Sequence, residues 1–309
     1  MLIFTFLSVV AIASGCAYVS SQMKDGTVLQ ASAEPAYLHL IITRPGEQPA
    51  SVAIPEDIGG WRNIFPLIDK SAVSSWVKNI FPMVDDKAAI IGNIGGGLSE
   101  VVIVDVRQQR ITDEFWGYSP APSPDGRYIV FIKAYPPHFI PDASDYVLLY
   151  DVTRGPDGNR PVGVPYLDKL VNAGAAVYPP GTKTQDNNII GQMIAINISS
   201  GFLWAPDSSR FVFTEENQIP MYYYPVTKQY KMYPPKTILN LVLVNMATPY
   251  APPSVFTVDK CAPKCREKLR SVEFGHDGIK ANIQGFNRRG NSLRTIQVNY
   301  NEFIIPGSR

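Results

Sequence analysis

The stretch that decides the fold is PSPDGRYIVFI, residues 122–132. Proline favours a turn, the Asp125 side chain accepts backbone hydrogen bonds across it, and Gly126 supplies the positive φ that other residues resist. The β-branched and aromatic run that follows is nearly all apolar, which is typical of a strand buried on both faces. The sequence therefore predicts a tight hairpin at Asp125 that leads directly into a core strand.

The same pattern recurs along the chain. WAPDSSRFVFT (204–214) repeats it with Asp207 in the turn, and VEFGHDGIKANIQGF (272–286) is a degenerate copy with Asp277. A fainter copy is FPMVDDKAAIIGNI (81–94). A pattern that recurs several times along a chain indicates equivalent supersecondary units that stack on one another.

Each of the two best copies is followed by a second strand that ends in Asp or Asn. DYVLLYDV (145–152) follows the first copy, and LNLVLVNM (239–246) follows the second. Further strand-length runs fill the chain from residue 37 onward, whereas the best helical pattern is confined to residues 69–80. These patterns predict an all-β protein.

Composition narrows the class of protein. The chain has 309 residues, of which 45% are hydrophobic and 18% are charged, so it has enough apolar material for a packed core and is not disordered as a whole. The formal net charge is +1, and no basic stripe of the kind that binds nucleic acid is present. No nucleic-acid partner is expected.

The repeat W/Y-x-P-D-(G/S)-x-x-(I/V/F)-(V/A)-F resembles that of the TolB-type β-propeller family, shared with the propeller domains of prolyl oligopeptidase-like proteins. The resemblance covers residues 81–300 and implies a β-propeller-like array of four-stranded antiparallel sheets, about four to six blades. An incomplete propeller or a two-sheet β-sandwich is the alternative. The sequence separation between Asp125 and Asp207 is longer than one blade, which has about 40–50 residues. We therefore expect insertions, at residues 154–200 and 219–236, in a domain that covers residues 36–309.

The N-terminus has the pattern of an exported protein. Residues 1–15, MLIFTFLSVVAIASG, are uncharged and apolar and are expected to be a signal peptide. The following Cys16 completes a tetrad, Ala-Ser-Gly-Cys, that resembles the bacterial lipobox and implies lipid attachment at this cysteine. The alternative is an ordinary signal peptide with an incidental cysteine. Residues 16–35 are expected to be a flexible tether between a membrane-anchored lipid and the folded body.

The two remaining cysteines, Cys261 and Cys265, lie in CAPKC. In an oxidising compartment an even, local pair favours a disulfide. Half of a metal site is the alternative, but the usual spacing is C-x2-C with a second pair of ligands, and no such partners lie nearby in the sequence. We predict the disulfide and no metal.

No catalytic constellation emerges from the sequence. The three histidines, His39, His138 and His276, are interpreted as structural or surface residues. The G-x-S-x-G motif of serine hydrolases is not found. The turn aspartates lack the nearby oxygen ligands that calcium needs. No catalytic residue and no cofactor is therefore predicted.

A cluster of tyrosine and methionine is the strongest binding signal. Residues of these types are enriched in the cores of protein interfaces. A flap folded on the protein's own surface is the alternative. The cluster comprises Met221, Tyr222, Tyr223, Tyr224, Tyr230, Met232 and Tyr233.

The resemblance to TolB-type propellers, which are interaction platforms of the cell envelope, implies a non-catalytic envelope lipoprotein that binds another envelope protein or a peptide. One alternative is an enzyme acting on glycans or peptides through carboxylates that converge from several blades. Another is a structural subunit of a surface assembly.

Overall fold

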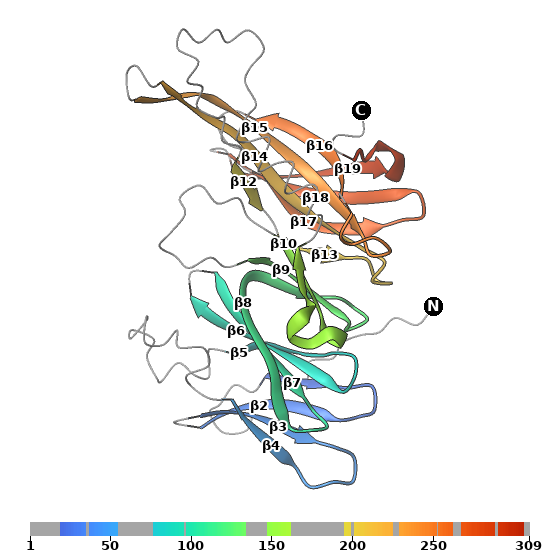
Figure 1. Cartoon of the computed structure of the whole chain (residues 1–309). Coiled ribbons are helices and arrows are strands. Elements are labelled where there is room, and N and C mark those ends of the chain that lie inside the picture. The colour runs from blue at the N-terminus through green and yellow to red at the C-terminus, as the bar shows by residue number, and fades with distance from the viewer. Residues whose placement is uncertain are drawn as a thin grey trace. The chain divides into compact units, whose positions relative to one another are not determined.

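The computed structural model describes residues 19–34, 37–54, 77–95, 97–133, 147–161, 195–198, 201–224, 229–251, 253–261, 267–287 and 290–305 (Figure 1). The chain divides into two compact units. One comprises residues 1–129 and 150–159, and the other comprises residues 130–149 and 160–309. Within the described ranges, no helix has the length and apolar character that crossing a membrane requires.

The first sheet is an antiparallel meander of four strands, drawn in blue in Figure 1: β1 (Val19–Gln22), β2 (Val28–Glu34), β3 (Tyr37–Thr43) and β4 (Ala50–Ile54). The expected flexible tether over residues 16–35 is therefore wrong for residues 19–34. Leu29 of β2 is fully buried, so this segment belongs to the core. Its Asp-Gly turn at 25–26 and the apolar residues after it form a repeat unit that the small polar composition conceals.

The second sheet has seven strands: β5 (Val77–Pro82), β6 (Lys87–Gly95), β7 (Leu98–Asp105), β8 (Arg110–Pro122), β9 (Tyr128–Lys133), β10 (Val147–Asp151) and β11 (Asn159–Pro161). β8 pairs with β7 along residues 110–118, and the next residue, Ser119, has a positive φ of 53°. The seven strands therefore consist of two four-stranded meanders that share β8, bent at Ser119. The 3-10 segment η3 (Val152–Gly158) connects β10 to β11.

The core of the first unit lies between the first sheet and one face of the second. Buried Leu40, Val52 and Ile54 of the first sheet belong to one cluster with Ile90 and Val102 of the second. The adjacent strands β6 and β7 each contribute a run of buried residues, because both faces of these strands are covered.

The third sheet contains β12 (Ala195–Ile198), β13 (Leu203–Trp204), β14 (Arg210–Tyr224), β15 (Gln229–Asn245) and β16 (Ser254–Cys261). β12 and β13 pair with successive parts of β14 and so form one interrupted first strand. The fourth sheet contains β17 (Glu267–Phe274), β18 (Gly278–Asn287) and β19 (Gly290–Asn299), followed by the 3-10 turn η4 (Tyr300–Glu302).

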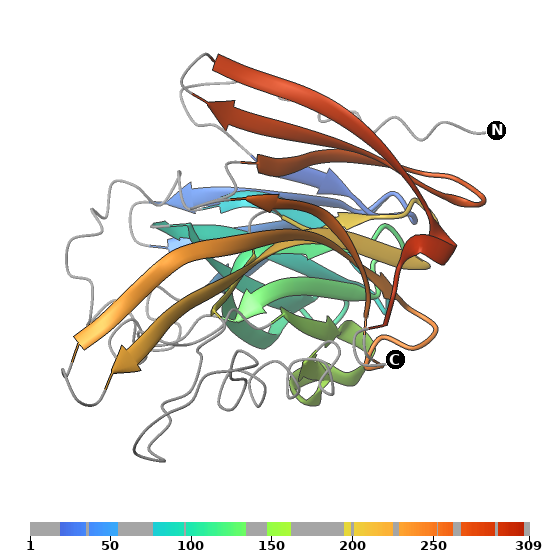
Figure 2. The same ribbon diagram turned by 90° about the horizontal axis from the view of Figure 1, so that it is seen from above.

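The third and fourth sheets share the core of the second unit. Val212 and Leu241 of the third sheet form one buried cluster with Ile279, Ile283 and Val298 of the fourth. Figure 2 shows the strands of these two sheets from above.

The hairpins at Asp125 and Asp207 have the same hydrogen bonds. The Ser123 amide donates to the Tyr128 carbonyl (2.8 Å) and the Gly126 amide donates to the Ser123 carbonyl (2.9 Å). In the second hairpin, Ala205 donates to Arg210 (2.9 Å) and Ser208 to Ala205 (2.9 Å). The residue after each aspartate has a positive φ, 76° at Gly126 and 59° at Ser208. Each hairpin leads into a buried strand, β9 or β14, as the sequence predicts.

The chain is thus an all-β, propeller-like array of antiparallel sheets. Apart from β12 and β13, which both pair with β14, strands that are neighbours in the sequence are neighbours in each sheet. β-Sandwiches instead use Greek-key connections that exchange strands between sheets. The helical pattern at residues 69–80 is misleading, because residues 77–80 belong to β5 and the rest lie outside the described residues. Apolar residues at helical spacing also fit a half-buried strand when the run is short.

The predicted insertions have a different character from that expected. Most of residues 219–236 continue β14 and β15, so this segment is not a loop. Of residues 154–200, the parts within η3, β11 and β12 are described, and the remainder lies outside the described residues.

Candidate functional site

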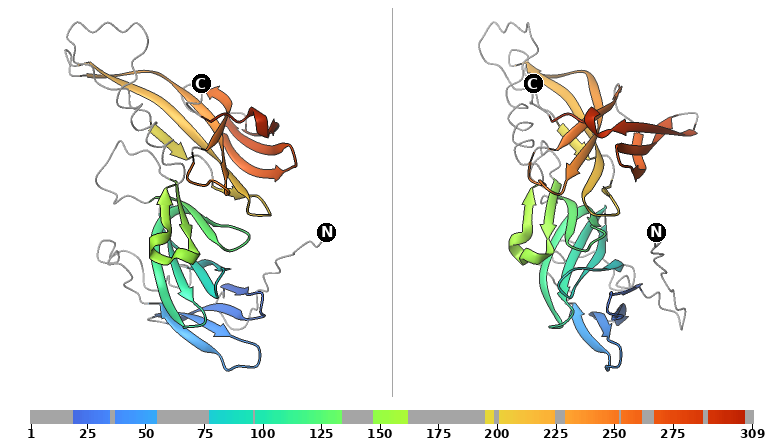
Figure 3. Two further views of the ribbon diagram at one scale, coloured as in Figure 1. Left: turned by 45° about the vertical axis from the view of Figure 1, so that its right-hand side comes forward. Right: turned by 90° about the vertical axis from the view of Figure 1, so that its right-hand side faces the viewer.

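The predicted tyrosine and methionine cluster lies on the outer part of the β14–β15 hairpin, seen as the long golden ribbon in Figure 1. β16 pairs with β15 only along residues 237–243, and β12 pairs with β14 only along residues 215–218. Residues 219–224 and 229–236, which we call the arm, therefore pair only with each other among the described residues. Figure 3 shows the arm extending past the end of β16 in two further views.

The register of the arm places its residues on two faces. Met221 pairs with Met232 and Tyr223 pairs with Tyr230, while Tyr222 pairs with Lys231 between them. Opposite residues in an antiparallel ladder share a face, and successive pairs alternate. One face of the arm thus carries two methionines and two tyrosines in a row. Tyr224 pairs with Gln229, and Tyr233 lies where the register shifts near Ile219 and Met221.

The turn aspartates have a local structural role. Asp125 accepts hydrogen bonds from the Arg127 amide (3.1 Å) and the Ser123 hydroxyl (2.5 Å). Asp207 accepts bonds from the Ser209 hydroxyl (2.7 Å) and amide (3.0 Å), which hold the pKa of its carboxyl below the ordinary value. Asp277 is exposed in the turn before β18. No group of metal-ligating side chains occurs among the described residues.

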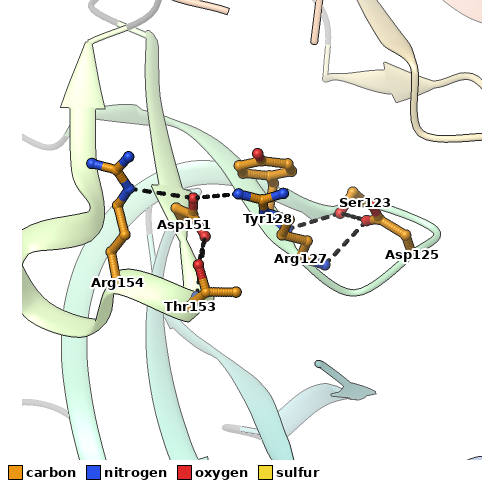
Figure 4. Close-up of polar contacts among 7 residues, drawn as sticks. All are labelled: Ser123, Asp125, Arg127, Tyr128, Asp151, Thr153 and Arg154. Carbon is orange, nitrogen blue, oxygen red and sulfur yellow. Dashed lines mark hydrogen bonds and ion pairs between the residues drawn. The ribbon is translucent and has the colours of Figure 1, made fainter. Parts of the chain in front are cut away.

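Next to the Asp125 hairpin lies a charged network centred on Asp151, at the end of β10 (Figure 4). The Asp151 side chain is only 3% exposed, and it contacts Arg127 Nη2 at 3.3 Å and Arg154 Nε at 3.6 Å. Its other oxygen accepts the Thr153 hydroxyl at 2.6 Å. Burial alone raises the pKa of Asp151, but the bonds from Thr153 and Arg127 outweigh it and the pKa is lowered. The network holds the Asp125 hairpin against the end of β10.

A second polar cluster, which the sequence did not reveal, lies on β7 and β8. Glu100 pairs with Trp116, and Glu114 lies two residues before Trp116 on the same face, so the two carboxyl groups are diagonal neighbours. Burial raises the pKa of Glu114, a hydrogen bond with Glu100 opposes the rise, and the charge of Asp113 adds to it. Glu100 itself is buried.

Asp113 alternates with Glu114 along β8 and so lies on the other face of that strand, close to Tyr150 of β10. The Tyr150 side chain is fully buried against the Phe115 ring, with ring centroids 4.8 Å apart. Burial, together with the charge of Asp113, raises the pKa of the Tyr150 phenol. Because the sequence pattern of β8 mixes charged and aromatic residues, it does not indicate that Asp113 and Glu114 are partly buried.

A cleft of about 300 Å³ lies in the first unit between the turns of the first and second sheets. Its walls include Asp25, Arg44, Asp86 and Arg107. Arg44 is already engaged, since it donates to Glu47 (3.0 Å) and to the Val106 carbonyl (2.9 Å). Hydrogen bonds from the Thr27 amide and hydroxyl lower the pKa of Asp25. The cleft is polar and mixed in charge.

The remaining predicted sites are placed only in part. Cys261 ends β16, while Cys265 and the lipid-attachment residue Cys16 lie outside the described residues. His39 is in β3 and His276 is exposed beside Asp277, whereas His138 lies outside the described residues.

Comparison with known proteins shows distant likeness to propeller-containing enzymes. No family model matches the chain, and no curated protein matches it. A prolyl endopeptidase structure is 12% identical with a TM-score of 0.35, over 91% of this chain and 41% of that chain. Porphyromonas gingivalis dipeptidyl peptidase 4 is 15% identical with a TM-score of 0.44, over 91% of this chain and 38% of that chain.

The β-propeller domain of the Trilobed protease from Pyrococcus furiosus is 8% identical with a TM-score of 0.29, over 91% of this chain and 85% of that chain. The chain therefore spans about two fifths of the length of the two peptidases. The assignment of the fold rests on the strand pairing and hydrogen bonds described above.

Proposed function

We propose that this protein is a non-catalytic binding platform of the bacterial cell envelope, held to a membrane by lipid on Cys16, and that it docks another envelope protein or a peptide through the arm. The register of the arm carries the proposal. It aligns Met221, Met232, Tyr223 and Tyr230 on one face of a ribbon that extends beyond its sheet.

The chemistry of these residue types supports docking. Tyrosine offers a large contact area and a hydroxyl group at little cost in conformational entropy, and methionine adapts to irregular partner surfaces. A two-stranded ribbon by itself is marginally stable in water. Contact with a partner would therefore stabilise the arm as well as the complex.

The test removes the arm and keeps the sheet. Gln218 and Thr237 face each other in the ladder, so residues 219–236 can be replaced by Asn-Gly, which favours a tight hairpin turn. A second variant replaces Met221, Tyr223, Tyr230 and Met232 with threonine, which retains the ribbon but removes its aromatic and methionine face. Both variants and the parent are expressed with the N-terminal cysteine intact, crosslinked in cells and purified.

We expect a defined partner with the parent and its loss with both variants, while thermal unfolding of the sheet stays close to that of the parent. Recovery of the same partner by the arm-less variant would refute docking through the arm. Crosslinking of no partner by the parent would refute the platform itself.

A second candidate function is an enzyme that acts on glycans or peptides. The observation in its favour is the contact between Glu100 and Glu114, one of which has a raised pKa as a general acid requires. Both residues, however, lie on neighbouring strands of one sheet, so they do not converge from several blades. The cleft in the first unit is lined by other residues. Hydrolysis of a glycan or peptide substrate that is lost in Glu114→Gln and in Glu100→Gln would favour the enzyme.

A further inference from the structure

Among the residues that the structure describes, the fourth sheet has three strands, one fewer than the four of the first sheet. In the first and third sheets the chain returns after the third strand and adds a fourth, β4 beside β3 and β16 beside β15. After β19 the chain instead passes through η4 and pairs with the third sheet. The Val255 amide donates to the Ile304 carbonyl at 2.8 Å, and the Ile304 amide donates to the Val255 carbonyl at 2.9 Å. Figure 2 shows the chain turning away from β19 after η4.

The position beside β19 is therefore vacant among the described residues, since β19 pairs only with β18. The Tyr300 amide donates to the Asp277 carbonyl at 2.9 Å, and the register from 278 to 299 is unbroken. Because hydrogen-bonded and non-hydrogen-bonded pairs alternate, the amide and carbonyl groups of Leu293, Thr295 and Gln297 point away from β18. These groups form a ready template for another strand.

The edge of β19 lacks the features that normally protect sheet edges. Proteins guard such edges with bulges, charges, proline or short strands. β17, at the opposite edge of the same sheet, has a register shift between Leu269 and Ser271 and carries several charged residues. β5 has a register shift as well. β19 has ten residues, no register shift, no proline and a single charged residue, Arg294.

Apolar side chains lie next to the vacant position on both faces. Leu293 is 67% exposed on the outer face. On the inner face Ile296 is only partly buried, although it packs against the core cluster that contains Val298. In the first sheet the equivalent inner positions are covered by Val52 and Ile54 of β4, which are 5% and 3% exposed.

We propose that β19 accepts a fourth strand from another polypeptide, in the form of an extended segment with apolar residues at alternate positions. Its backbone would pair with Leu293, Thr295 and Gln297, and its inward side chains would cover Ile296 as β4 covers the first sheet. The bound segment would add a strand to the edge of the sheet by backbone hydrogen bonds, and would not pack on a face of the sheet. It is independent of the arm and of the docking proposed for it.

The test is residue-resolved amide hydrogen exchange on the whole protein, with and without a peptide of sequence SVFTVDK, the β16 segment at residues 254–260. That segment fills the fourth position in its own sheet, where Phe256 and Val258 pack against the core. We expect the amides of Thr295 and Gln297 to exchange fast in the protein alone and to slow about tenfold with peptide. The amides of Arg294 and Ile296, already paired with β18, should not change.

Two variants of Thr295 test whether the peptide acts at the edge of β19. Thr295→Pro removes an outward amide without breaking a bond to β18 and should abolish the peptide effect. Thr295→Ala is its control, because both variants lose the hydroxyl bond to Asn282 (2.7 Å) while only the proline variant loses the amide. If Thr295→Pro does not fold, Gln297→Pro tests the same edge.

Three results would overturn the proposal. The first is no slowing at Thr295 and Gln297 with saturating peptide. The second is slow exchange of both amides in the dilute protein without peptide, which would mean that the chain covers its own edge. The third is protection that rises with protein concentration alone, which would identify a second copy as the occupant.

Discussion

The Val152 amide donates a 2.9 Å hydrogen bond to the Arg127 carbonyl and so joins the end of a third strand to the turn between the first and second strands of the same meander. The same bond occurs in three other meanders. The pairs are Val106 with Asp86 (2.8 Å), Met246 with Ser209 (2.9 Å) and Tyr300 with Asp277 (2.9 Å). We call these four the closing bonds. They show that the repeat is structural as well as sequential.

The first prediction concerns the turn before β9. Gly126 has φ of 76°, and a Cβ there would lie 3.0 Å from the Met83 Cα and 3.1 Å from the Pro82 carbonyl oxygen. Gly126→Ala should therefore lower the free energy of unfolding by at least about 1–2 kcal/mol, because the left-handed conformation is strained and the neighbouring backbone must move. Urea denaturation followed by circular dichroism measures the change.

The equivalent turn supplies the control. Ser208 has a positive φ of 59° without being glycine, so Ser208→Gly relieves strain and should leave stability within about 1 kcal/mol of the parent. Equal stability of Gly126→Ala and the parent would show that the Asp125 turn does not have the conformation described.

The second prediction concerns pH. Because the pKa of Asp151 is lower in the folded protein than in the unfolded chain, its stabilising effect is complete above the unfolded value of about 3.9 and is lost as pH falls through the folded value. Asp151→Asn should lower stability by about 1–3 kcal/mol at neutral pH. It should also flatten the acid limb of the stability curve below about pH 4. A dependence as steep as that of the parent would contradict the charged network in Figure 4.

Much of the architecture is predictable from the sequence because its decisive signals are local. Pro-Asp followed by a residue with positive φ and a β-branched run specifies a hairpin within about ten residues, and the hairpins at Asp125 and Asp207 formed as predicted. The Asp25 turn does not stand out in the sequence, although Asp-Gly precedes an apolar strand there, because a short polar segment after a leader-like sequence resembles a tether. Closing bonds join residues far apart in sequence, so no local pattern reveals them.

The candidate sites show the same division. The tyrosine and methionine cluster is visible in the sequence as composition, but its arrangement on one face depends on the register between β14 and β15. The contact of Glu100 with Glu114 depends on the pairing of β7 with β8. That no described strand covers the outer edge of β19 depends on where Ile304 pairs. None of these pairings follows from a motif.

The third prediction concerns Glu114, a partly buried acid on β8. The pKa of Glu114 is raised, so the folded protein loses stability as pH rises from the unfolded value of about 4.3 through the folded value. Glu114→Gln removes the charge and should raise the midpoint of thermal unfolding at neutral pH, with no difference from the parent at low pH. Glu273→Gln is the matched control, since Glu273 is exposed and pairs with Lys280. A lower midpoint for Glu114→Gln would contradict this prediction and would indicate that the ionised Glu114 carboxylate stabilises the folded protein.

The fourth prediction concerns the anchor. If Cys16 carries lipid, cells that express the parent should incorporate radiolabelled palmitate into the protein, and Cys16→Ser should lose the label. Cys261→Ser, expressed in parallel, should retain it. Label that persists in Cys16→Ser would refute lipid attachment at this residue, and an unlabelled parent would support the ordinary signal peptide.

The central claim is that these four meanders are equivalent units, each held by the same closing bond within it. The most direct measurement is the scalar coupling across each hydrogen bond, from the amide nitrogen of Val106, Val152, Met246 or Tyr300 to its partner carbonyl carbon, in isotope-labelled protein. We predict a detectable coupling for all four pairs. Couplings for Val152 and Met246 that connect to carbonyls other than those of Arg127 and Ser209 would contradict the repeat, and with it the propeller-like array.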